Sequence, residues 1–402
     1  MKMWVYVVRR VALLVPVIIG VMTILFIIVS ALPIPERLQS VVPFSKYGYS
    51  QYLPCKQIGI NQPGNCVNPV WTYGTHLLNL DKPVPIQYAY YIYNSLTFNW
   101  GTTNTGSEAL ALFPQVRNTP VATALADFLP YTIELAFLSL AMILVLAIPL
   151  GNYSAVYRNR PIDQGSRIFS FSLYALPTFL LGSLVLLGGL AAVGGVYAIC
   201  GSNATSYTIF TGSWPDPHCF AGSTYPSWMA NGLVTHPTGF PTVDALIAAI
   251  QTGNSQDWSL AWQSFYRMLL PAAVIALGSV AVILRYVRNS MLEVMNLDFV
   301  RTARSKGVPE STVIRKHAGR NSLNVTVTIL GLTFAFFIGG FPIVEYVFGL
   351  NGVGRILAFS LQQPLDYGLI FGSTLLFTII VVVANIIVDV LYAYLDPRVR
   401  LG

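Results

Sequence analysis

Long apolar runs that alternate with polar segments are the main pattern along this chain. A helix that crosses the hydrocarbon core of a bilayer needs about 20 predominantly apolar residues. Runs of that length lie at residues 11–32, 132–153, 168–193, 268–287, 323–348 and 369–392. Two of them contain an interior proline, Pro16 and Pro177, which membrane helices tolerate when they pack against neighbours. The pattern predicts an all-α membrane protein with six transmembrane helices.

A polar segment of a different kind, Arg285–Leu323, separates the fourth run from the fifth and carries eight Lys and Arg. Its local signals predict a short helix through the Val300–Lys306 region, capped at its start by Asn296 or Asp298. Gly307 supplies the left-handed residue that commonly ends such a helix. The segment is therefore expected to be ordered rather than a plain loop.

A second short helix is predicted to follow this glycine. Pro309 suits the start of a helix and Glu310 its first turn. The result is a helix–glycine–helix elbow that faces the solvent. The small residues at the bend, which let another protein approach the backbone, are Ala303, Ser305 and Gly307. The charged residues that flank them are Arg301, Arg304 and Lys306. The elbow is either a docking site for another protein or an ordinary basic loop.

The composition independently favours a membrane protein. Hydrophobic residues make up 54% of the chain, charged residues 10%, and the mean hydropathy is +0.60, whereas soluble domains carry roughly 25% charged residues. The first apolar run follows Arg9 and Arg10 in the manner of a signal peptide. However, the run contains about 22 uncharged residues, which is longer than the apolar core of a typical signal peptide. No small-x-small cleavage site follows at Ala31-Leu32-Pro33. We expect this helix to be retained in the cell membrane.

The distribution of basic residues predicts the orientation, because Lys and Arg are enriched in cytoplasmic loops. The two ends and the two short segments between runs hold 16 of the 23 Lys and Arg, whereas the far longer segments on the opposite side hold six. Both termini are therefore expected in the cytoplasm. The predicted organisation is helix one at 1–32, an external loop at 33–128, helices two and three at 129–193, a second external loop at 194–266, and helices four to six at 267–402 with a cytoplasmic loop at 288–322.

All four cysteines fall in the two predicted external loops. Cys55 and Cys66 lie in the first loop, and Cys200 and Cys219 in the second. Disulfides persist in oxidising compartments, so we predict the bridges Cys55–Cys66 and Cys200–Cys219. Four free thiols or a pairing across the loops are the alternatives, since four cysteines allow three connectivities.

The residue order of the elbow supports a more specific interpretation. The run LEVMNLDFVRTARSKGVPESTVIRKHAGRN resembles the coupling-loop signature of the membrane permeases of ABC importers, in the dipeptide/oligopeptide/nickel branch. The matching positions are Asp298, Val300, Arg301, Thr302, Ala303, Arg304, Lys306, Gly307, His317, Ala318, Arg320 and Asn321, while Phe299 stands where a Tyr is usual. The resemblance extends over almost the whole chain. Stretches 44–75 and 200–230 look like additions.

This resemblance implies a set of partners. An external solute-binding protein would deliver a peptide or an oligosaccharide, a second homologous permease would complete the pore, and two ATPase subunits would drive alternating access. The implied ATPase-docking loop consists of Asp298, Phe299, Val300, Arg301, Thr302, Ala303, Arg304, Ser305, Lys306 and Gly307. Membrane lipid is the other expected partner, and no nucleic acid is expected.

Motifs for catalysis and metal binding are absent from the sequence. No G-x-x-x-x-G-K-[ST] phosphate-binding loop occurs, so ATP and Mg are expected in the partner ATPase subunits rather than in this chain. We expect no catalytic residue, cofactor or metal here and do not expect the chain to be an enzyme. The histidines are isolated and are expected at the surface or in hydrogen bonds: His76, His218, His236 and His317.

Three carboxylates near the ends of apolar runs allow a different function. Glu134, Glu345 and Asp389 are ionisable groups of the kind that often marks a transport pathway, although helix packing or anchoring is the other interpretation. A pathway role would favour a secondary transporter or channel that uses an intramembrane carboxylate. A membrane sensor whose external loops bind ligands without transport is a third hypothesis.

Overall fold

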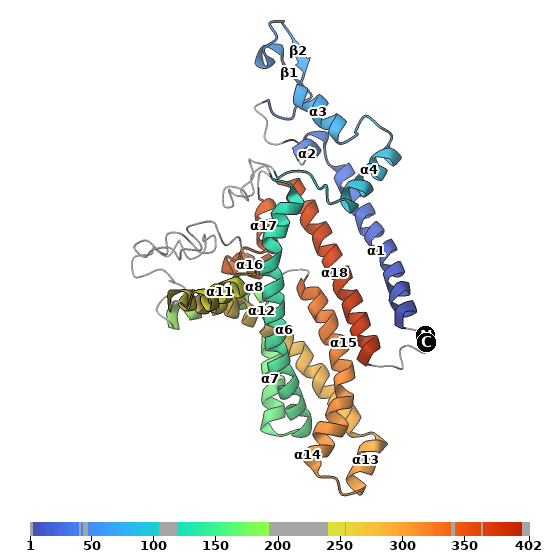
Figure 1. Ribbon diagram of the computed structural model, residues 1–402, viewed down its shortest axis with the longest axis vertical. Coiled ribbons are helices and arrows are strands. Elements are labelled where there is room, and N and C mark those ends of the chain that lie inside the picture. Colours follow the sequence, from blue (N-terminus) through green and yellow to red (C-terminus); the bar gives the residue numbers. More distant parts are fainter. Residues whose placement is uncertain are drawn as a thin grey trace. The chain divides into compact units, whose positions relative to one another are not determined.

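A computed structural model describes residues 3–39, 42, 47–103, 119–192, 240–253, 255–338, 342–362 and 365–395. The elements before the long helices are α1 (Met3–Ala31), α2 (Ile34–Gln39), β1 (Tyr52–Pro54), η1 (Cys55–Ile58), β2 (Asn65–Val67), α3 (Pro69–Leu77) and α4 (Val84–Leu96) (Figure 1). Then follow α6 (Val121–Val156), α7 (Pro161–Ala175), α8 (Thr178–Ala192), α11 (Pro241–Thr252) and α12 (Ser255–Met295). The last elements are α13 (Asp298–Ser305), α14 (Glu310–Thr312), η4 (Val313–Ala318), α15 (Gly319–Ile338), α16 (Pro342–Phe348), α17 (Val353–Ser360) and α18 (Tyr367–Leu395).

The chain forms two compact units. Unit 1 comprises Met1–Arg10, Ile133–Gly349 and Val381–Gly402, and unit 2 comprises Val11–Thr132 and Leu350–Ile380. Each unit therefore combines segments that are far apart in the sequence.

Three helices in the described part of the chain are long and apolar enough to cross a membrane by themselves: Val121–Val156, Met268–Met295 and Tyr367–Val388. Two further pairs of helices reach this standard only when joined across a sharp bend, so the described residues contain three to five candidate spans by length and composition. The prediction of a helical membrane protein is confirmed. Six crossings and their orientation stay predictions.

One of the bends corrects the expected continuous helix over residues 168–193. Helices α7 and α8 meet at 102°. Between them, Leu176 has an extended backbone with φ −87° and ψ 123°, because a residue that precedes proline is disfavoured in the helical region. Pro177 also lacks the N–H that a continuing helix needs. Pro16, in contrast, lies inside the continuous helix α1, as the sequence suggests.

Unit 1 is arranged around α12, which packs against α7, α8, α11 and α15 (Figure 1). Helix α6 also approaches α12 closely. A Cβ atom added to Gly151 on α6 would lie only 2.7 Å from the side chain of Val287 on α12. Ser290 of α12 donates a hydrogen bond to the backbone carbonyl of Ser322 on α15 at 3.1 Å. These contacts hold together the helix ends that lead into and out of the elbow.

Unit 2 contains the described part of the predicted first external loop, and this part is folded. Strands β1 and β2 form an antiparallel ribbon in which Leu53 pairs with Cys66. A disulfide joins Cys55 to Cys66, which is the pairing expected for this loop. The ribbon is a small departure from the all-α prediction. Cys200 and Cys219 lie outside the described residues.

The core of unit 2 consists of two apolar clusters. Val121, Leu125, Val353 and Leu369 are among the buried residues that pack α6, α17 and α18 together. A second cluster, which includes Met22 and Leu375, packs α1 against α18 and α4. Together these clusters fix the elements that surround a pocket in this unit.

Candidate functional site

The elbow predicted between the fourth and fifth apolar runs is present and is built from short pieces. Helix α12 continues to Met295, so residues 288–295 of the predicted loop are helical. Helix α13 follows, then a turn, then α14, which runs directly into the π-helical turn η4 and into α15. Single π-helical turns occur frequently at functional sites. The elbow proper comprises residues 296–318.

Neither residue expected to cap α13 does so. The N-cap residue is Leu297, whose side chain cannot accept a hydrogen bond, and Asp298 is the first helical residue. There its carboxylate lies near the positive end of the helix dipole and 3.7 Å from Arg301. Both side chains are largely exposed, so this ion pair contributes little to stability.

Gly307 ends α13 in the left-handed conformation, as predicted. Its φ is +72°, and its N–H donates to the carbonyl of Arg304 at 3.0 Å. The next N–H, of Val308, donates to the carbonyl of Ala303 at 3.3 Å. These two bonds satisfy carbonyls that a helix end otherwise leaves without partners. The chain then reverses toward Pro309 and α14.

Arg304 and Glu310 tie the two arms of the elbow together. The Arg304 side chain donates from Nε to Oε2 at 3.1 Å and from Nη2 to Oε1 at 2.7 Å. This two-bond geometry orients both groups. The hydrogen bonds from Arg304 lower the pKa of Glu310 below its ordinary value. Its place in the sequence suggests Arg304 as a handle for a partner, whereas the structure pairs it within the elbow.

The inner face of α13 packs on the chain itself. Val300 is fully buried and Ala303 is 8% exposed, and their spacing of three places them on the same side of the helix. They belong to one apolar cluster with residues of α6, α12 and η4: Ala155, Met291, Val294, Val313 and Ala318. The side chain of Ala303 thus packs within the chain, and its predicted part in docking stays a prediction. The apolar pair at i and i+3 is the sequence signal that identifies the buried side.

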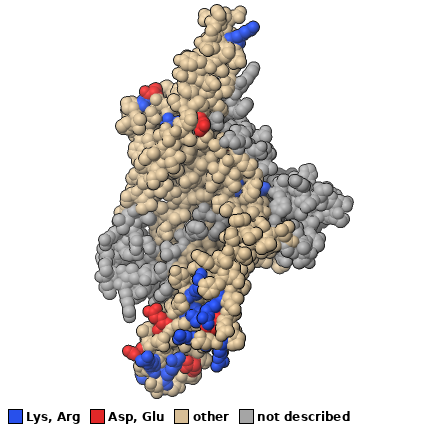
Figure 2. All heavy atoms as spheres, turned by 180° about the vertical axis from the view of Figure 1, so that it is seen from behind, with Lys and Arg blue, Asp and Glu red and all other residues tan. Residues whose placement is uncertain are grey.

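The outer face of α13 is exposed and polar. Arg301, Thr302 and Ser305 are all exposed, and the 3.6-residue helical period places them opposite Val300 and Ala303. Figure 2 shows basic side chains gathered over the elbow with acidic side chains among them. Phe299, 40% exposed, lies beside this face. A short helix that is held rigidly and presents a polar face is suited to docking in a groove of another protein.

A second polar cluster, whose pairing across two helices has no local sequence signal, lies between α7 and α12. Asp163 is fully buried and accepts hydrogen bonds from the Ser154 hydroxyl at 2.7 Å and the Asn159 N–H at 2.9 Å. Arg288 and Arg167 also donate to its carboxylate. The cluster therefore connects the predicted cytoplasmic segment between α6 and α7 to the helix that leads into the elbow.

The three carboxylates considered as pathway groups have different surroundings. Glu134 lies well inside α6 rather than near its end and accepts a hydrogen bond from the Thr242 N–H at 3.4 Å. Glu345 is 1% exposed in the first turn of α16. The side chain of Asp389 is outside the described part of the structure. A pathway role for these residues stays a hypothesis.

Two of the four histidines lie in the described part of the chain. His76 lies in the last turn of α3 and His317 in η4, while His218 and His236 are outside the described residues. Within the ranges described above, no group of three or more His, Cys, Asp and Glu side chains is arranged to hold a metal ion.

Comparison with known proteins gives a similarity that includes the elbow. The family model described as the binding-protein-dependent transport system inner membrane component matches residues 147–401. The oligopeptide transport system permease protein AppB of Bacillus subtilis is 28% identical over 396 residues, which cover 98% of this chain and 99% of that protein. The probable D,D-dipeptide transport system permease protein DdpB of Escherichia coli is 31% identical over 326 residues, covering 81% of this chain and 83% of that protein.

Proposed function

Because the chain belongs to the family of binding-protein-dependent transport system inner membrane components, we propose that it is a pore-forming subunit of an ATP-driven peptide importer. In this role it receives the solute from an external binding protein. A second permease completes the pore, and two separate ATPase subunits supply the energy. The names of the two relatives, which refer to an oligopeptide and to a D,D-dipeptide, favour peptides over oligosaccharides as the cargo.

The observation that carries this proposal is the two-sided construction of α13. Its inner face is held by the buried Val300 and Ala303, and its end is tied to α14 by Arg304 and Glu310. Its outer face, with Arg301, remains exposed. An ATPase subunit that grips the outer face therefore moves the whole elbow as one body, because the inner contacts resist local bending.

The elbow is connected directly to two long apolar helices, so a displacement of the elbow is transmitted to them. The elbow follows α12 directly and continues into α15 without a break. Closure of the ATPase subunits on ATP binding would displace both helices together, and the solute pathway would change from inward-open to outward-open. Hydrolysis and reopening would return the pathway to the inward-open state. The docking residues in this mechanism are those of the outer face: Asp298, Arg301, Thr302, Ser305 and Lys306.

A matched pair of serine substitutions tests the docking role. Ser305→Trp adds a large side chain to the outer face of α13, and Ser311→Trp adds the same side chain to the exposed surface of α14. Both variants should insert in the membrane and unfold at the temperature of the unaltered chain. With the partner subunits in proteoliposomes, Ser305→Trp should lower ATP-dependent peptide uptake at least about tenfold, the equivalent of ~1.4 kcal/mol of docking energy. Ser311→Trp should retain uptake.

Two results contradict the proposal. Full uptake by the Ser305→Trp variant would show that the outer face of α13 is not the ATPase contact. Uptake that persists in vesicles without any ATPase subunit would instead favour a secondary transporter, for which Glu345, buried at 1% exposure, would be the first carboxylate to replace.

A further inference from the structure

Unit 2 contains a pocket of about 540 Å³ that shares no residue with the elbow. This volume falls within the range of about 300–1,000 Å³ that is usual for small-molecule sites. Helix α4 forms one wall, and the remaining walls come from α1, α2, α18, the end of α3 and the loop after α4. Most of the lining belongs to residues 77–102, which the sequence predicts to be external.

Two helices end beside the pocket at residues with a left-handed backbone. Asn79 follows α3 with φ +54°, and Phe98 follows α4 with φ +58°. The turn at Phe98 is closed by the Asn99 N–H, which donates to the carbonyl of Asn94 at 2.9 Å. Glycine is usual at such a position, because a side chain disfavours the left-handed region. Backbone strain of this kind clusters at functional sites, and here both strained turns hold lining residues.

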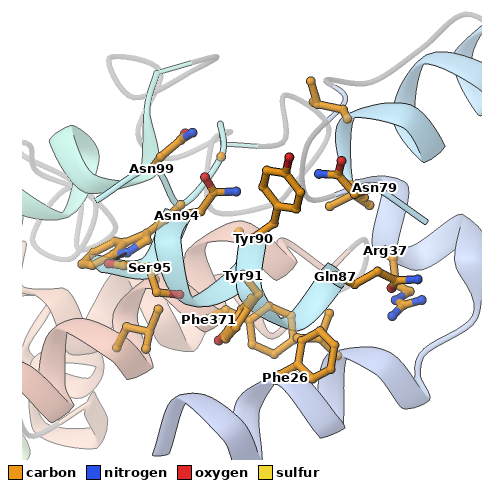
Figure 3. A pocket seen from close by; sticks show the side chains of 18 of the residues that line it. Phe26, Arg37, Asn79, Gln87, Tyr90, Tyr91, Asn94, Ser95, Asn99 and Phe371 are labelled. Carbon is orange, nitrogen blue, oxygen red and sulfur yellow. Dashed lines mark hydrogen bonds between the residues drawn. The ribbon is translucent and has the colours of Figure 1, made fainter. Parts of the chain in front are cut away.

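Carboxamide side chains line the pocket on two sides. Figure 3 shows Asn79 and Gln87 on one side, and Asn94 and Asn99 on the other. The Gln87 side-chain nitrogen donates to the carbonyl of Lys82 at 2.8 Å, which fixes the orientation of its amide. The asparagine side chains of the lining make no hydrogen bond within the described part of the chain. Each of them therefore offers a ligand both a donor and an acceptor.

The floor of the pocket is aromatic. Phe26 of α1 packs against Tyr91 of α4 with ring centroids 5.5 Å apart, and Figure 3 shows Phe371 of α18 beside Tyr91. Trp100 is held by a hydrogen bond of 3.1 Å from its Nε1 to the carbonyl of Ser95. The floor therefore offers fixed apolar surface for a ligand side chain.

The charges of the lining favour a neutral ligand. Among the lining residues that the structure describes, there is no Asp or Glu, and Arg37 is the one charged side chain. Arg37 already interacts with another group of the chain. A charged group of a ligand would therefore lose its hydration without gaining a free counter-charge, which is unfavourable. The matching ligand is uncharged, carries both hydrogen-bond donors and acceptors, and has an apolar part.

We propose that this pocket binds an uncharged internal stretch of a peptide, with the peptide backbone on the carboxamides and one apolar side chain on the aromatic floor. Each peptide residue presents one N–H donor and one C=O acceptor, which match the donor and acceptor of an Asn or Gln side chain. The termini of the peptide take no part. The proposal rests on the proposed function only in taking peptides as the cargo, and it adds a binding site within the permease itself.

A neutral sugar is the other ligand with matching hydrogen-bonding groups. A sugar ring stacks on a flat, open aromatic face. In the pocket, the rings of Phe26 and Tyr91 are inclined to each other by 49°, and those of Phe98 and Trp100 by 45°. Rings inclined in this way form a cleft rather than a platform. The floor consequently favours a peptide side chain over a sugar ring.

Equilibrium dialysis with the purified full-length chain in nanodiscs tests the class of ligand. The probes are the tripeptide Ala-Tyr-Ala, the same tripeptide acetylated and amidated at its ends, the capped tripeptide Ala-Lys-Ala, and maltotriose. Capped Ala-Tyr-Ala should bind as tightly as the free tripeptide, because neither end is recognised. Capped Ala-Lys-Ala should bind at least about tenfold more weakly, because its ammonium group is placed in the pocket without a counter-charge. Maltotriose should bind more weakly than capped Ala-Tyr-Ala.

Asparagine substitutions test the carboxamides. Asn94→Ala and Asn99→Ala should each weaken capped Ala-Tyr-Ala by about two- to twelvefold, the equivalent of ~0.5–1.5 kcal/mol for one neutral hydrogen bond. Both variants should unfold at the temperature of the unaltered chain, because neither side chain bonds to another described residue. Asn61→Ala is the matched control, since Asn61 is exposed between η1 and β2 and lies outside the pocket. It should bind the peptide unchanged.

A photoreactive probe locates the ligand independently of its affinity. Capped Ala-Xaa-Ala, in which Xaa is benzoylphenylalanine, should cross-link to the floor residues Phe26, Tyr91 or Phe371, identified by mass spectrometry after digestion. An excess of capped Ala-Tyr-Ala should suppress these cross-links. Cross-links confined to helices that do not line the pocket would overturn the proposal.

The remaining outcomes separate the site from the proposed function. Tighter binding of maltotriose than of capped Ala-Tyr-Ala would overturn the proposal, as would a tenfold preference for the free tripeptide over the capped one. An equal loss in Asn94→Ala and Asn61→Ala would also overturn it. If peptide uptake remains ATP-dependent while no probe binds, the site is wrong and the proposed function stands. If capped Ala-Tyr-Ala binds but uptake needs no ATPase, the proposed function is wrong and the site stands.

Discussion

Asp163 and Arg288, 125 residues apart in the sequence, form a buried bidentate ion pair. The Nε atom of Arg288 lies 2.7 Å from Oδ1 of Asp163, and its Nη2 atom lies 3.0 Å from Oδ2. Ser154 and Asn159 supply further hydrogen bonds to the carboxylate. Since Arg288 stands about two turns before the end of α12, this pair fixes the approach to the elbow relative to α7.

Removal of the acidic partner should be costly. Asp163→Asn keeps the shape of the side chain but leaves the Arg288 charge largely buried without an anion, and the loss of one partner of a buried pair typically costs about 3–5 kcal/mol. We expect a clear fall in the unfolding temperature of the purified chain in detergent. Arg167→Met removes a bond to the same carboxylate from a side chain that is 42% exposed, and it should cost only about 0–1 kcal/mol.

A double substitution separates the cost of an unpaired charge from the value of the pair. Asp163→Leu combined with Arg288→Met replaces both groups by apolar ones, and such replacements are often close to neutral. The double variant should therefore unfold at a higher temperature than Asp163→Asn. Equal losses in both variants would show that the pair itself, rather than the stranded charge, dominates stability.

The sequence alone predicts the helical membrane character and the position of the elbow, because both depend on local signals. Apolar runs and the order of Gly307, Pro309 and Glu310 act within a few residues. The disulfide between Cys55 and Cys66 joins residues that are also close in the chain. These features need no knowledge of which helices become neighbours.

Features that depend on tertiary contacts are not predictable in this way. The pairing of Asp163 with Arg288 requires α7 and α12 to lie side by side, which no local pattern encodes. Asp163 lies four residues before Arg167, and this spacing on a helix is a local signal for an ion pair. However, it identifies the more exposed Arg167 as the partner of Asp163 rather than the buried Arg288. The burial of Ala303 is likewise not predictable from its size, because a small residue suits close packing against the chain's own helices as well as the approach of a partner.

The ion pair between Arg304 and Glu310 should make a small, salt-sensitive contribution to the stability of the elbow. Both side chains are more than a third exposed, so a double-mutant cycle with Arg304→Gln and Glu310→Gln should give a coupling energy of about 0.2–1 kcal/mol. Amide hydrogen exchange across α13 measures it, and the difference should shrink as salt is raised. A coupling energy that does not change with salt would contradict an exposed ion pair.

The same ion pair predicts that the stability of the elbow depends on pH. The pKa of Glu310 is lowered in the folded chain by the hydrogen bonds from Arg304, so the folded state binds a proton less readily than the unfolded state. The stabilising contribution of the ion pair is therefore fully present at a pH above 4.5, the ordinary pKa of a Glu side chain. It is lost as the pH falls through the lower pKa of Glu310 in the folded state. Exchange within α13 should quicken over that interval, and Glu310→Gln should remove this part of the pH dependence.

Gly307 should be sensitive to backbone conformation rather than to size. A Cβ atom added there meets no other atom within 4 Å, but its φ of +72° is disfavoured for residues with a side chain. Gly307→Ala should therefore cost roughly 1–2 kcal/mol, and Gly307→Asn should cost less because Asn tolerates this conformation better. Exchange rates of the α13 amides in the two variants measure the difference. Equal effects of Ala and Asn would show that the cost is not conformational.

Reduction of the disulfide should loosen the ribbon without unfolding unit 2. Cys55 and Cys66 are separated by 11 residues. A disulfide typically stabilises the folded state by about 2–4 kcal/mol, because it restricts the conformations of the unfolded chain. Lys56 is exposed inside the loop, so limited digestion with trypsin reports the opening directly. Cleavage after Lys56 should become at least about tenfold faster on reduction, whereas cleavage after Lys82, outside the loop, should keep its rate. If both sites respond alike, the disulfide supports the whole unit. If neither responds, strand pairing and the hydrogen bonds of Asn68 to Gly48 and Ser50 hold the ribbon without it.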